Sequence, residues 1–232
     1  MSQYILNPPP VVFVPVALTG SEFPIRRIYC VGRNYLEHIR EMKESDERDP
    51  PFFFQKPRDA IVLNGQTVPY PPETNDFQFE VELVVAIGKS GRQISKDDAL
   101  GHIFGYAVGL DMTRRDRQRE SGKKGLPWEV GKSFDASAPC GMLHTVAEVG
   151  HISSGQIFIS VNDQTKQDSL IEKMIWNVPE IIINLSHIYD LVEGDLIYTG
   201  TPAGVAPVMP GDKLLCKVAG LSALEISIGA KR

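Results

Sequence analysis

The chain has 232 residues, of which 42% are hydrophobic and 23% charged, and its formal net charge is −5. These values are typical of a soluble globular domain and give no broad basic surface for nucleic acid. No apolar run reaches the roughly 18 residues of a membrane span, and the first residues lack the blocks of a signal peptide. The cysteines, Cys30, Cys140 and Cys216, show no zinc or disulfide spacing, so we expect reduced thiols in a cytoplasmic protein.

The first 24 residues contain NPPP and short β-branched runs. Proline excludes a long helix there, so we expect an extended N-terminal arm over 1–24 and a single catalytic domain over 25–232. Apolar and β-branched runs then predict strands at 27–31, 50–56, 76–88, 105–112, 157–162, 196–199, 214–218 and 223–228.

Few helices are expected between these strands. Helical composition predicts short helices over 34–42, 95–103 and 114–120, the last followed by a loop over 121–127. The clearest helix starts after Asn177, a plausible N-cap, and its apolar stripe ends before Gly194. Many short strands with few helices indicate a β-rich α+β domain.

The strand over 76–88 carries two carboxylates on a largely apolar face. Side chains two residues apart in a strand point the same way, so Glu80 and Glu82 lie about 7 Å apart on one side. Desolvating both charges is unfavourable unless a cation lies between them. With Asp111, at the end of another apolar run, they form a hard oxygen set suited to Mg²⁺, Mn²⁺ or Ca²⁺. An edge strand with solvent-facing glutamates, and Asp111 as a helix cap, fits the spacing equally well.

His38 and Glu41 are spaced i, i+3 in the helix predicted over 34–42. Such residues share one helix face, so the carboxylate can orient the imidazole as a general base for water. The same pair is also common on solvated helices, and the spacing alone does not separate the two interpretations.

Arg115, Gln118 and Lys132 follow Asp111 in the sequence. Near a metal, Arg115 and Lys132 would bind a carboxylate or stabilise developing negative charge. The alternative is a surface helix with internal salt bridges.

The segment YTGTPAGV, 198–205, runs from a predicted strand into a glycine-rich turn. Its backbone can approach a ligand closely, and Thr199 and Thr201 offer hydroxyl groups. It lacks the GxxxxGK[ST] pattern of a phosphate-binding loop. The alternative is a structural hairpin turn.

Together these segments resemble the fumarylacetoacetate hydrolase family. The matching pieces follow the family's order from about Arg27 to the C-terminus: CVGRNYLEHIREM, PFFFQKP, FEVELVVAIG, GLDMTRRDRQ, PWEVGKSFD and DLIYTGTPAGV. The resemblance implies an α+β, β-rich fold like the family's C-terminal domain, a mixed β-sandwich or roll, and a homodimer.

The resemblance also implies roles for individual residues. Glu80, Glu82 and Asp111 would bind Mg²⁺ or Mn²⁺. His38 and Glu41 would activate water on a segment that closes over the site, and Lys132 would join them in catalysis. The substrate would contact Arg115, Gln118, Thr201 and Gly200.

The implied chemistry is hydrolysis of a C–C bond beside two carbonyl groups of a small keto acid. Hydrolysis of fumarylpyruvate to fumarate and pyruvate ranks first. Acylpyruvate hydrolysis, or oxaloacetate decarboxylation or tautomerisation, ranks second because the same enolate serves each. A different class is a non-catalytic relative that binds a divalent cation. His38, Glu41 and Lys132 argue against it, since a structural metal site needs no base beside it.

Overall fold

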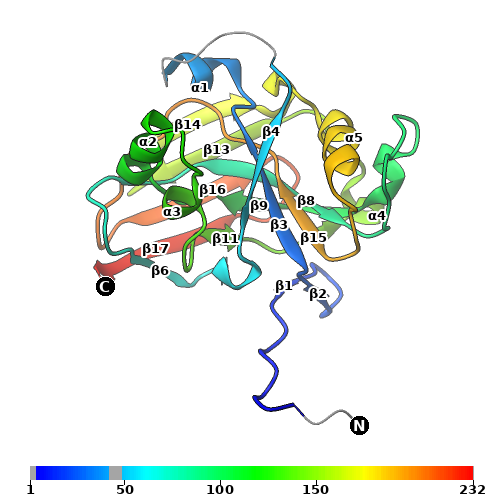
Figure 1. Ribbon diagram of the computed structural model, residues 1–232, viewed down its shortest axis with the longest axis horizontal. Helices are drawn as coiled ribbons and strands as arrows, with labels where there is room; N and C mark the ends of the chain where they lie inside the picture. Colours follow the sequence, from blue (N-terminus) through cyan, green and yellow to red (C-terminus); the bar gives the residue numbers. More distant parts are fainter. Residues whose placement is uncertain (1–3, 42–48, 232) are drawn as a thin grey trace.

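The computed structural model describes residues 4–41 and 49–231, and strands dominate this part of the chain (Figure 1). The largest sheet contains, in spatial order, β4 (Phe52–Lys56), β3 (Arg27–Gly32), β15 (Asp195–Tyr198), β8 (Val81–Ile87), β9 (Ile103–Leu110), β11 (Ala138–Cys140) and β5 (Ile61–Leu63), with β12 (His144–Thr145) also paired to β9. Most neighbours are antiparallel, but β3 runs parallel to β15 and β5 parallel to β11.

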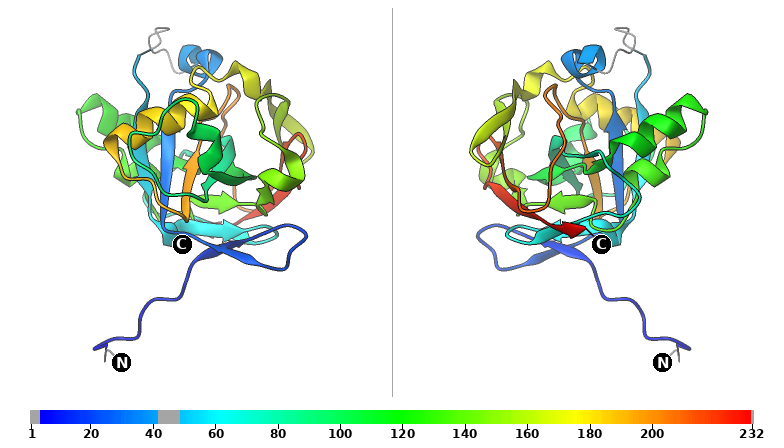
Figure 2. Two further views of the ribbon diagram at one scale, coloured as in Figure 1. Left: turned by 90° about the vertical axis from the view of Figure 1, so that its right-hand side faces the viewer. Right: turned by 90° about the vertical axis from the view of Figure 1, so that its left-hand side faces the viewer.

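A second sheet contains β14 (Gln164–Leu170), β13 (Gln156–Val161), β16 (Lys213–Val218), β17 (Leu224–Lys231) and β6 (Thr67–Tyr70). Two small sheets pair β1 (Phe13–Pro15) with β2 (Glu22–Pro24) and β10 (Thr113–Arg114) with β7 (Phe77–Gln78). Figure 2 shows the sheets curling around one interior. The fold is α+β and rich in strands, as predicted.

Helices are few and short in the described residues: α1 (Leu36–Glu41), α2 (Arg115–Lys123), α3 (Glu129–Lys132), α4 (Val146–Val149) and α5 (Val178–Ile188), with 3-10 turns η1 (Arg58–Ala60), η2 (Ala99–His102) and η3 (Ile171–Lys173). Helix α5 begins with the capping box formed by Asn177 and Glu180. No helix in this part of the chain is both long and apolar enough to cross a membrane.

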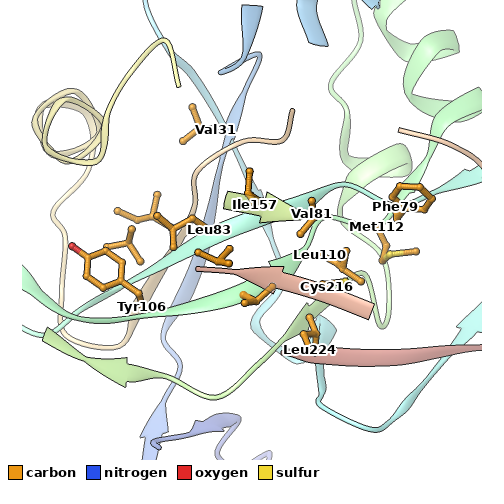
Figure 3. Packing of buried hydrophobic residues seen from close by; sticks show 14 of the residues in the cluster. Val31, Phe79, Val81, Leu83, Tyr106, Leu110, Met112, Ile157, Cys216 and Leu224 are labelled. Atoms are coloured by element: carbon orange, nitrogen blue, oxygen red, sulfur yellow. The ribbon is translucent and has the colours of Figure 1, made fainter. Parts of the chain in front are cut away.

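Strand β8 is buried on both faces, and its alternation is the one predicted. Val81 and Leu83 point into the space between the two large sheets, where they pack with Ile157, Cys216 and Leu224 (Figure 3). Val84 and Ala86 point the other way, into a second apolar cluster that includes residues of the N-terminal β1–β2 hairpin. The residues before β1 extend away from the body (Figure 2).

Several element boundaries differ from those predicted. The strand expected over 76–88 is divided into β7 and β8, and Glu80 lies in the gap between them. The helix expected over 95–103 is only the 3-10 turn η2, because Ser95 and Asp98 close a tight turn before the chain enters β9. Helix α2 extends into the segment expected to be a loop. Also not predicted were strands β5, β6, β10, β11, β12 and β14, helices α3 and α4, and the 3-10 turns η1 and η3. All three cysteines are free and buried.

Candidate active site

A cavity of about 450 Å³ is lined by residues of β3, β4, β8, α1, α2 and α3 and by Asp111, which directly follows β9. Its wall includes eight of the ten residues to which the family resemblance assigns a role: His38, Glu80, Glu82, Asp111, Arg115, Gln118, Lys132 and Thr201. Glu41 and Gly200 lie immediately behind it, in contact with His38 and Glu82 respectively. The fold therefore brings together residues that are more than 160 positions apart in the chain.

The three carboxylates converge because β8 and β9 are antiparallel neighbours. Their register pairs Val81 with Leu110, and the Asp111 backbone N–H donates to the Glu80 carbonyl oxygen at 2.9 Å. One carboxylate oxygen from each of Glu80, Glu82 and Asp111 lies within 4.8 Å of the others. The glutamates do not face solvent on an edge strand, since β8 lies between β15 and β9 and both side chains are buried.

Three buried cations surround these carboxylates. Lys132 Nζ lies 2.8 Å from Glu80 Oε2 and 2.7 Å from Asp111 Oδ2. Lys56 Nζ lies 2.8 Å from the other oxygen of Asp111. The Arg115 guanidinium pairs with Glu80 through Nη2. Each cation is almost completely excluded from water, as expected for groups with opposite charges beside them.

The charges are not evenly compensated across the cluster. Burial alone raises the pKa of Glu80, but the charges of Lys132 and Arg115 outweigh burial and lower it. Burial raises the pKa of Glu82 well above its usual value, and the negative charges of Asp111 and Glu80 raise it further. The opposing bond from the Gly200 N–H, 2.7 Å from Glu82 Oε2, does not offset these effects.

This arrangement fits a divalent cation. The donor set is entirely carboxylate oxygen, which Mg²⁺ and Mn²⁺ prefer. The carboxylate oxygens already converge on one point, and the Glu82 charge lacks a cationic side chain bonded to it among the residues described. A cation at that point would relieve the electrostatic penalty of ionising Glu82.

His38 is placed by α1 at the edge of the same cavity. Its Nδ1 lies 3.3 Å from Glu41 Oε2, and only about 8% of the residue is exposed. The bond with His38 lowers the pKa of Glu41, and a bond from the Gly204 N–H lowers it further despite partial burial. An ionised Glu41 can only accept, so it takes a hydrogen bond from His38 Nδ1–H, and Nε2 is left as the ring nitrogen outside that bond.

The YTGTPAGV segment, 198–205, contacts both the carboxylate cluster and the pair formed by His38 and Glu41. The Gly200 N–H donates to Glu82, and the Gly204 N–H donates to Glu41 at 3.2 Å. Gly204 has φ +99°, and a Cβ there would lie 2.2 Å from the Lys166 carbonyl oxygen. Only glycine fits that position, so the turn is more than a hairpin connection.

Both interpretations of the charged sequence of helix α2, a lining of the site and a surface helix with salt bridges, apply to different residues of the helix. Arg115 and Gln118 are buried, and they are bonded to each other at 2.6 Å. Arg117 and Arg119 are more exposed and form ion pairs with carboxylates outside the triad, although Arg119 also lines the cavity. Asp111 does not cap the helix, because the N-cap position is Arg114.

Two buried residues of the site were missed in the sequence. Lys56, at the end of β4, donates to the Met112 carbonyl oxygen at 3.1 Å and also to that of Lys132. Gln167 donates to Thr201 Oγ1 at 2.8 Å and accepts from the Val81 N–H at 3.0 Å. A lysine ending an aromatic strand was a usable signal for Lys56. Gln167 lies in a polar segment that offered none.

Comparison with known proteins agrees with this geometry. The family model described as fumarylacetoacetate (FAA) hydrolase C-terminal matches residues 27–228. A fumarylpyruvate hydrolase from Ralstonia sp is 47% identical over 178 residues, covering 77% of this chain and 92% of that protein. A mitochondrial oxaloacetate decarboxylase from Dictyostelium discoideum is 40% identical over 197 residues, covering 84% and 90%.

Solved structures show the same relationship. The crystal structure of fumarylpyruvate hydrolase from Pseudomonas aeruginosa, in complex with Mn²⁺ and pyruvate, matches with a TM-score of 0.96 at 44% identity. The match covers 98% of this chain and all of that one. The chain therefore belongs to the fumarylacetoacetate hydrolase family.

Proposed function

We propose that this protein is a metal-dependent hydrolase that cleaves the C–C bond of an acylpyruvate, with fumarylpyruvate as the favoured substrate. One observation carries the proposal: a buried carboxylate triad and a carboxylate-oriented histidine line the same cavity. The similarity to fumarylpyruvate hydrolases, one of them crystallised with Mn²⁺ and pyruvate, supports the choice of substrate.

Glu80, Glu82 and Asp111 would hold Mg²⁺ or Mn²⁺, which supplies positive charge to the keto acid and to the pyruvate enolate that leaves. Lys132 keeps its charge beside these carboxylates, because Asp111 and Glu80 raise the pKa of its ammonium group despite burial. It adds to the positive potential at the end of the cavity where negative charge develops. In the structure Arg115 is bonded to Gln118 and to Glu80, so it positions both at the cavity wall.

His38 is proposed to act as the general base. With Nδ1 bonded to Glu41, Nε2 takes a proton from water, and the resulting hydroxide adds to the acyl carbonyl carbon. The C–C bond to the methylene carbon then breaks, giving a carboxylic acid and the enolate of pyruvate. Protonation of that methylene carbon completes the reaction, and the proton held on His38 is available for it.

Decarboxylation or tautomerisation of oxaloacetate is the second candidate. Mitochondrial relatives with these names are 37–40% identical to this chain over most of its length. Both reactions pass through an enolate of the same keto acid type but need no attack by water. His38 is therefore expected to matter more for hydrolysis than for decarboxylation.

The experiment that tests the proposal uses the full chain after treatment with EDTA. Turnover of fumarylpyruvate, acetylpyruvate and oxaloacetate is followed by loss of enol absorbance and by pyruvate release, with Mn²⁺ or Mg²⁺ added back. Glu82→Ala should lose Mn²⁺ binding and turnover together, whereas Glu225→Ala, at an exposed position of β17, should retain both. No metal-dependent turnover of the three keto acids by the parent protein would refute the proposed function.

We also propose a homodimer of the single catalytic domain over 25–232, on the family resemblance alone. Analytical ultracentrifugation tests this, and a monomer at micromolar concentration would contradict it. Val14 and Phe23, from the N-terminal hairpin, pack with Ile28 and Ala86 of the main sheet, so removal of residues 1–24 is expected to lower the melting temperature.

A further inference from the structure

We propose that Gln167 is a positioning residue, which orients the Thr201 hydroxyl group as a hydrogen-bond donor to the carboxylate of a bound keto acid. The inference rests on the proposed function and deepens it, because it names how one group of the cavity recognises the substrate. Thr201 lines the cavity and is only about 3% exposed. Gln167, on β14, is completely buried and is bonded to Thr201 without lining the cavity itself.

The hydrogen-bond partners of Gln167 fix the orientation of its side-chain amide. Oε1 accepts from the Val81 N–H at 3.0 Å, and a backbone N–H can only donate. Nε2 donates one hydrogen to Thr201 Oγ1 at 2.8 Å and the other to the Pro202 carbonyl oxygen at 2.6 Å. The reversed amide would place two donors face to face at Val81 and two acceptors face to face at Pro202, so only this orientation fits.

The bond from Gln167 determines the role left to the Thr201 hydroxyl group. The amide nitrogen cannot accept a hydrogen bond, so Thr201 Oγ1 is the acceptor and its own hydrogen points elsewhere. Within residues 4–41 and 49–231, that hydrogen has no acceptor. Leaving a buried donor unmade costs stability. Because Thr201 lines the cavity, a bound ligand is the partner that can supply the missing acceptor.

The position of Thr201 in the chain identifies which ligand group this is. The preceding residue, Gly200, donates its N–H to Glu82 Oε2 at 2.7 Å. Thr201 therefore lies at the end of the cavity that contains the carboxylate triad, where the proposed substrate places its keto acid. An ionised carboxylate only accepts hydrogen bonds, and it is the strongest acceptor that a keto acid offers to a hydroxyl donor.

A β-bulge in β14 brings Gln167 to this position. The pairing of β14 with β13 shifts register next to Gln167, which leaves Lys166 as an extra residue opposite β13. Bulges re-aim side chains and are over-represented beside active sites. The Lys166 carbonyl oxygen lies so close to Gly204 that a Cβ on that glycine would be 2.2 Å away. The bulge and the glycine together allow β14 to approach the segment 198–205, so that Gln167 reaches Thr201.

Substitutions of Thr201 test whether its hydroxyl group binds the ligand. The full chain is loaded with saturating Mn²⁺, and the probe is pyruvate, whose Kd is measured from the relaxation of its methyl protons by the bound Mn²⁺. Thr201→Val removes the hydroxyl group at nearly constant shape and should raise this Kd about 10- to 100-fold, the range for a lost hydrogen bond to a charged group. Thr201→Ser keeps the hydroxyl group and should restore most of the affinity.

Gln167→Glu tests the positioning role. Its carboxylate still accepts from the Val81 N–H but cannot donate to Thr201, whose hydroxyl group then donates to it and no longer to the ligand. We expect a loss of pyruvate affinity similar to that of Thr201→Val, with Mn²⁺ affinity retained. In the Thr201→Val background the same substitution should have little further effect, because it acts through a hydroxyl group that is already absent. Gln164→Glu, at an exposed position of the same strand, is the matched control and should bind pyruvate like the parent.

Mn²⁺ binding in each preparation shows whether the variant is folded. If Gln167→Glu fails this control, Gln167→Met takes its place; it removes the donor without adding a charge, and its effect should also disappear in the Thr201→Val background. Additive losses in the double variant, or unchanged pyruvate affinity in the Gln167 variants, would overturn the positioning role, as would a parent that binds no pyruvate. If pyruvate binding follows the expected pattern but no keto acid is turned over, the proposed function fails and the positioning role stands.

Discussion

Replacement of Lys56 by methionine tests whether the buried charges of the site depend on one another. Lys56 Nζ lies 2.8 Å from Asp111 Oδ1, and both side chains are at most 1% exposed. Methionine keeps much of the side-chain volume but removes the charge and the donors to the Met112 and Lys132 carbonyl oxygens. The variant therefore leaves a carboxylate buried without one of its two cationic partners.

The expected loss is large because removing one partner of a buried ion pair typically costs about 3–5 kcal/mol. For a domain of this size, about 1 kcal/mol corresponds to roughly 2–4 °C in melting temperature, so Lys56→Met should melt roughly 6–20 °C below the parent in EDTA. Saturating Mn²⁺ should reduce the deficit to less than half, since a cation bound at Asp111 replaces the missing charge.

The assay is thermal unfolding followed by circular dichroism, with EDTA and with Mn²⁺. Lys217→Met, at an exposed position of β16, is the matched control and should stay within about 0.5 kcal/mol of the parent in both conditions. An identical deficit with and without Mn²⁺ would show that Lys56 serves packing alone and that its charge is not coupled to the cation site.

Three further variants test separate parts of the site. Glu82→Gln should melt above the parent in EDTA, because burial with Asp111 and Glu80 nearby raises the pKa of Glu82. Because the pKa of Glu82 is higher in the folded protein than the ordinary value of 4.5, ionising Glu82 lowers the stability of the parent as pH rises above that value. The difference in melting temperature between Glu82→Gln and the parent should therefore grow with pH. A difference that stays constant with pH would contradict this prediction. His38→Ala should lose acylpyruvate hydrolysis but bind Mn²⁺ in calorimetry like the parent, and equal loss of oxaloacetate decarboxylation would give His38 a broader role. Gly204→Ala should lower kcat for hydrolysis with little change in Mn²⁺ affinity. The added Cβ would clash with the Lys166 carbonyl oxygen and displace the N–H that bonds to Glu41. An unchanged kcat would show that this turn does not support the His38–Glu41 pair.

The period-2 pattern of β8 was predictable because it depends only on local geometry. Val81 and Leu83 alternate with Glu82 and Val84 in the structure as they do in the sequence. The first residue of this strand was not predictable from the sequence. The strand begins at Val81, and Glu80 lies before it. Nothing local marks that break, because it comes from the pairing of the preceding residues with β10 in a separate sheet.

The composition of the candidate site was also readable from the sequence, since carboxylates in apolar runs and an i, i+3 His–Glu pair are local signals. Their convergence was not. Asp111 lies beside Glu80 only because of the register between β8 and β9. Glu41, the partner of His38, accepts a hydrogen bond from Gly204, which is 163 positions away in the chain.

The sequence by itself therefore determined which chemical groups the protein possesses and the alternation of its central strand, because both are properties of neighbouring residues. The tertiary structure decided whether the glutamates of that strand are buried or solvated. It also decided which cations, Lys56 among them, compensate the buried carboxylates. These outcomes depend on strand order, burial and long-range pairing, which fix the dielectric surroundings of a charge and are not encoded in the local periodicity of the chain.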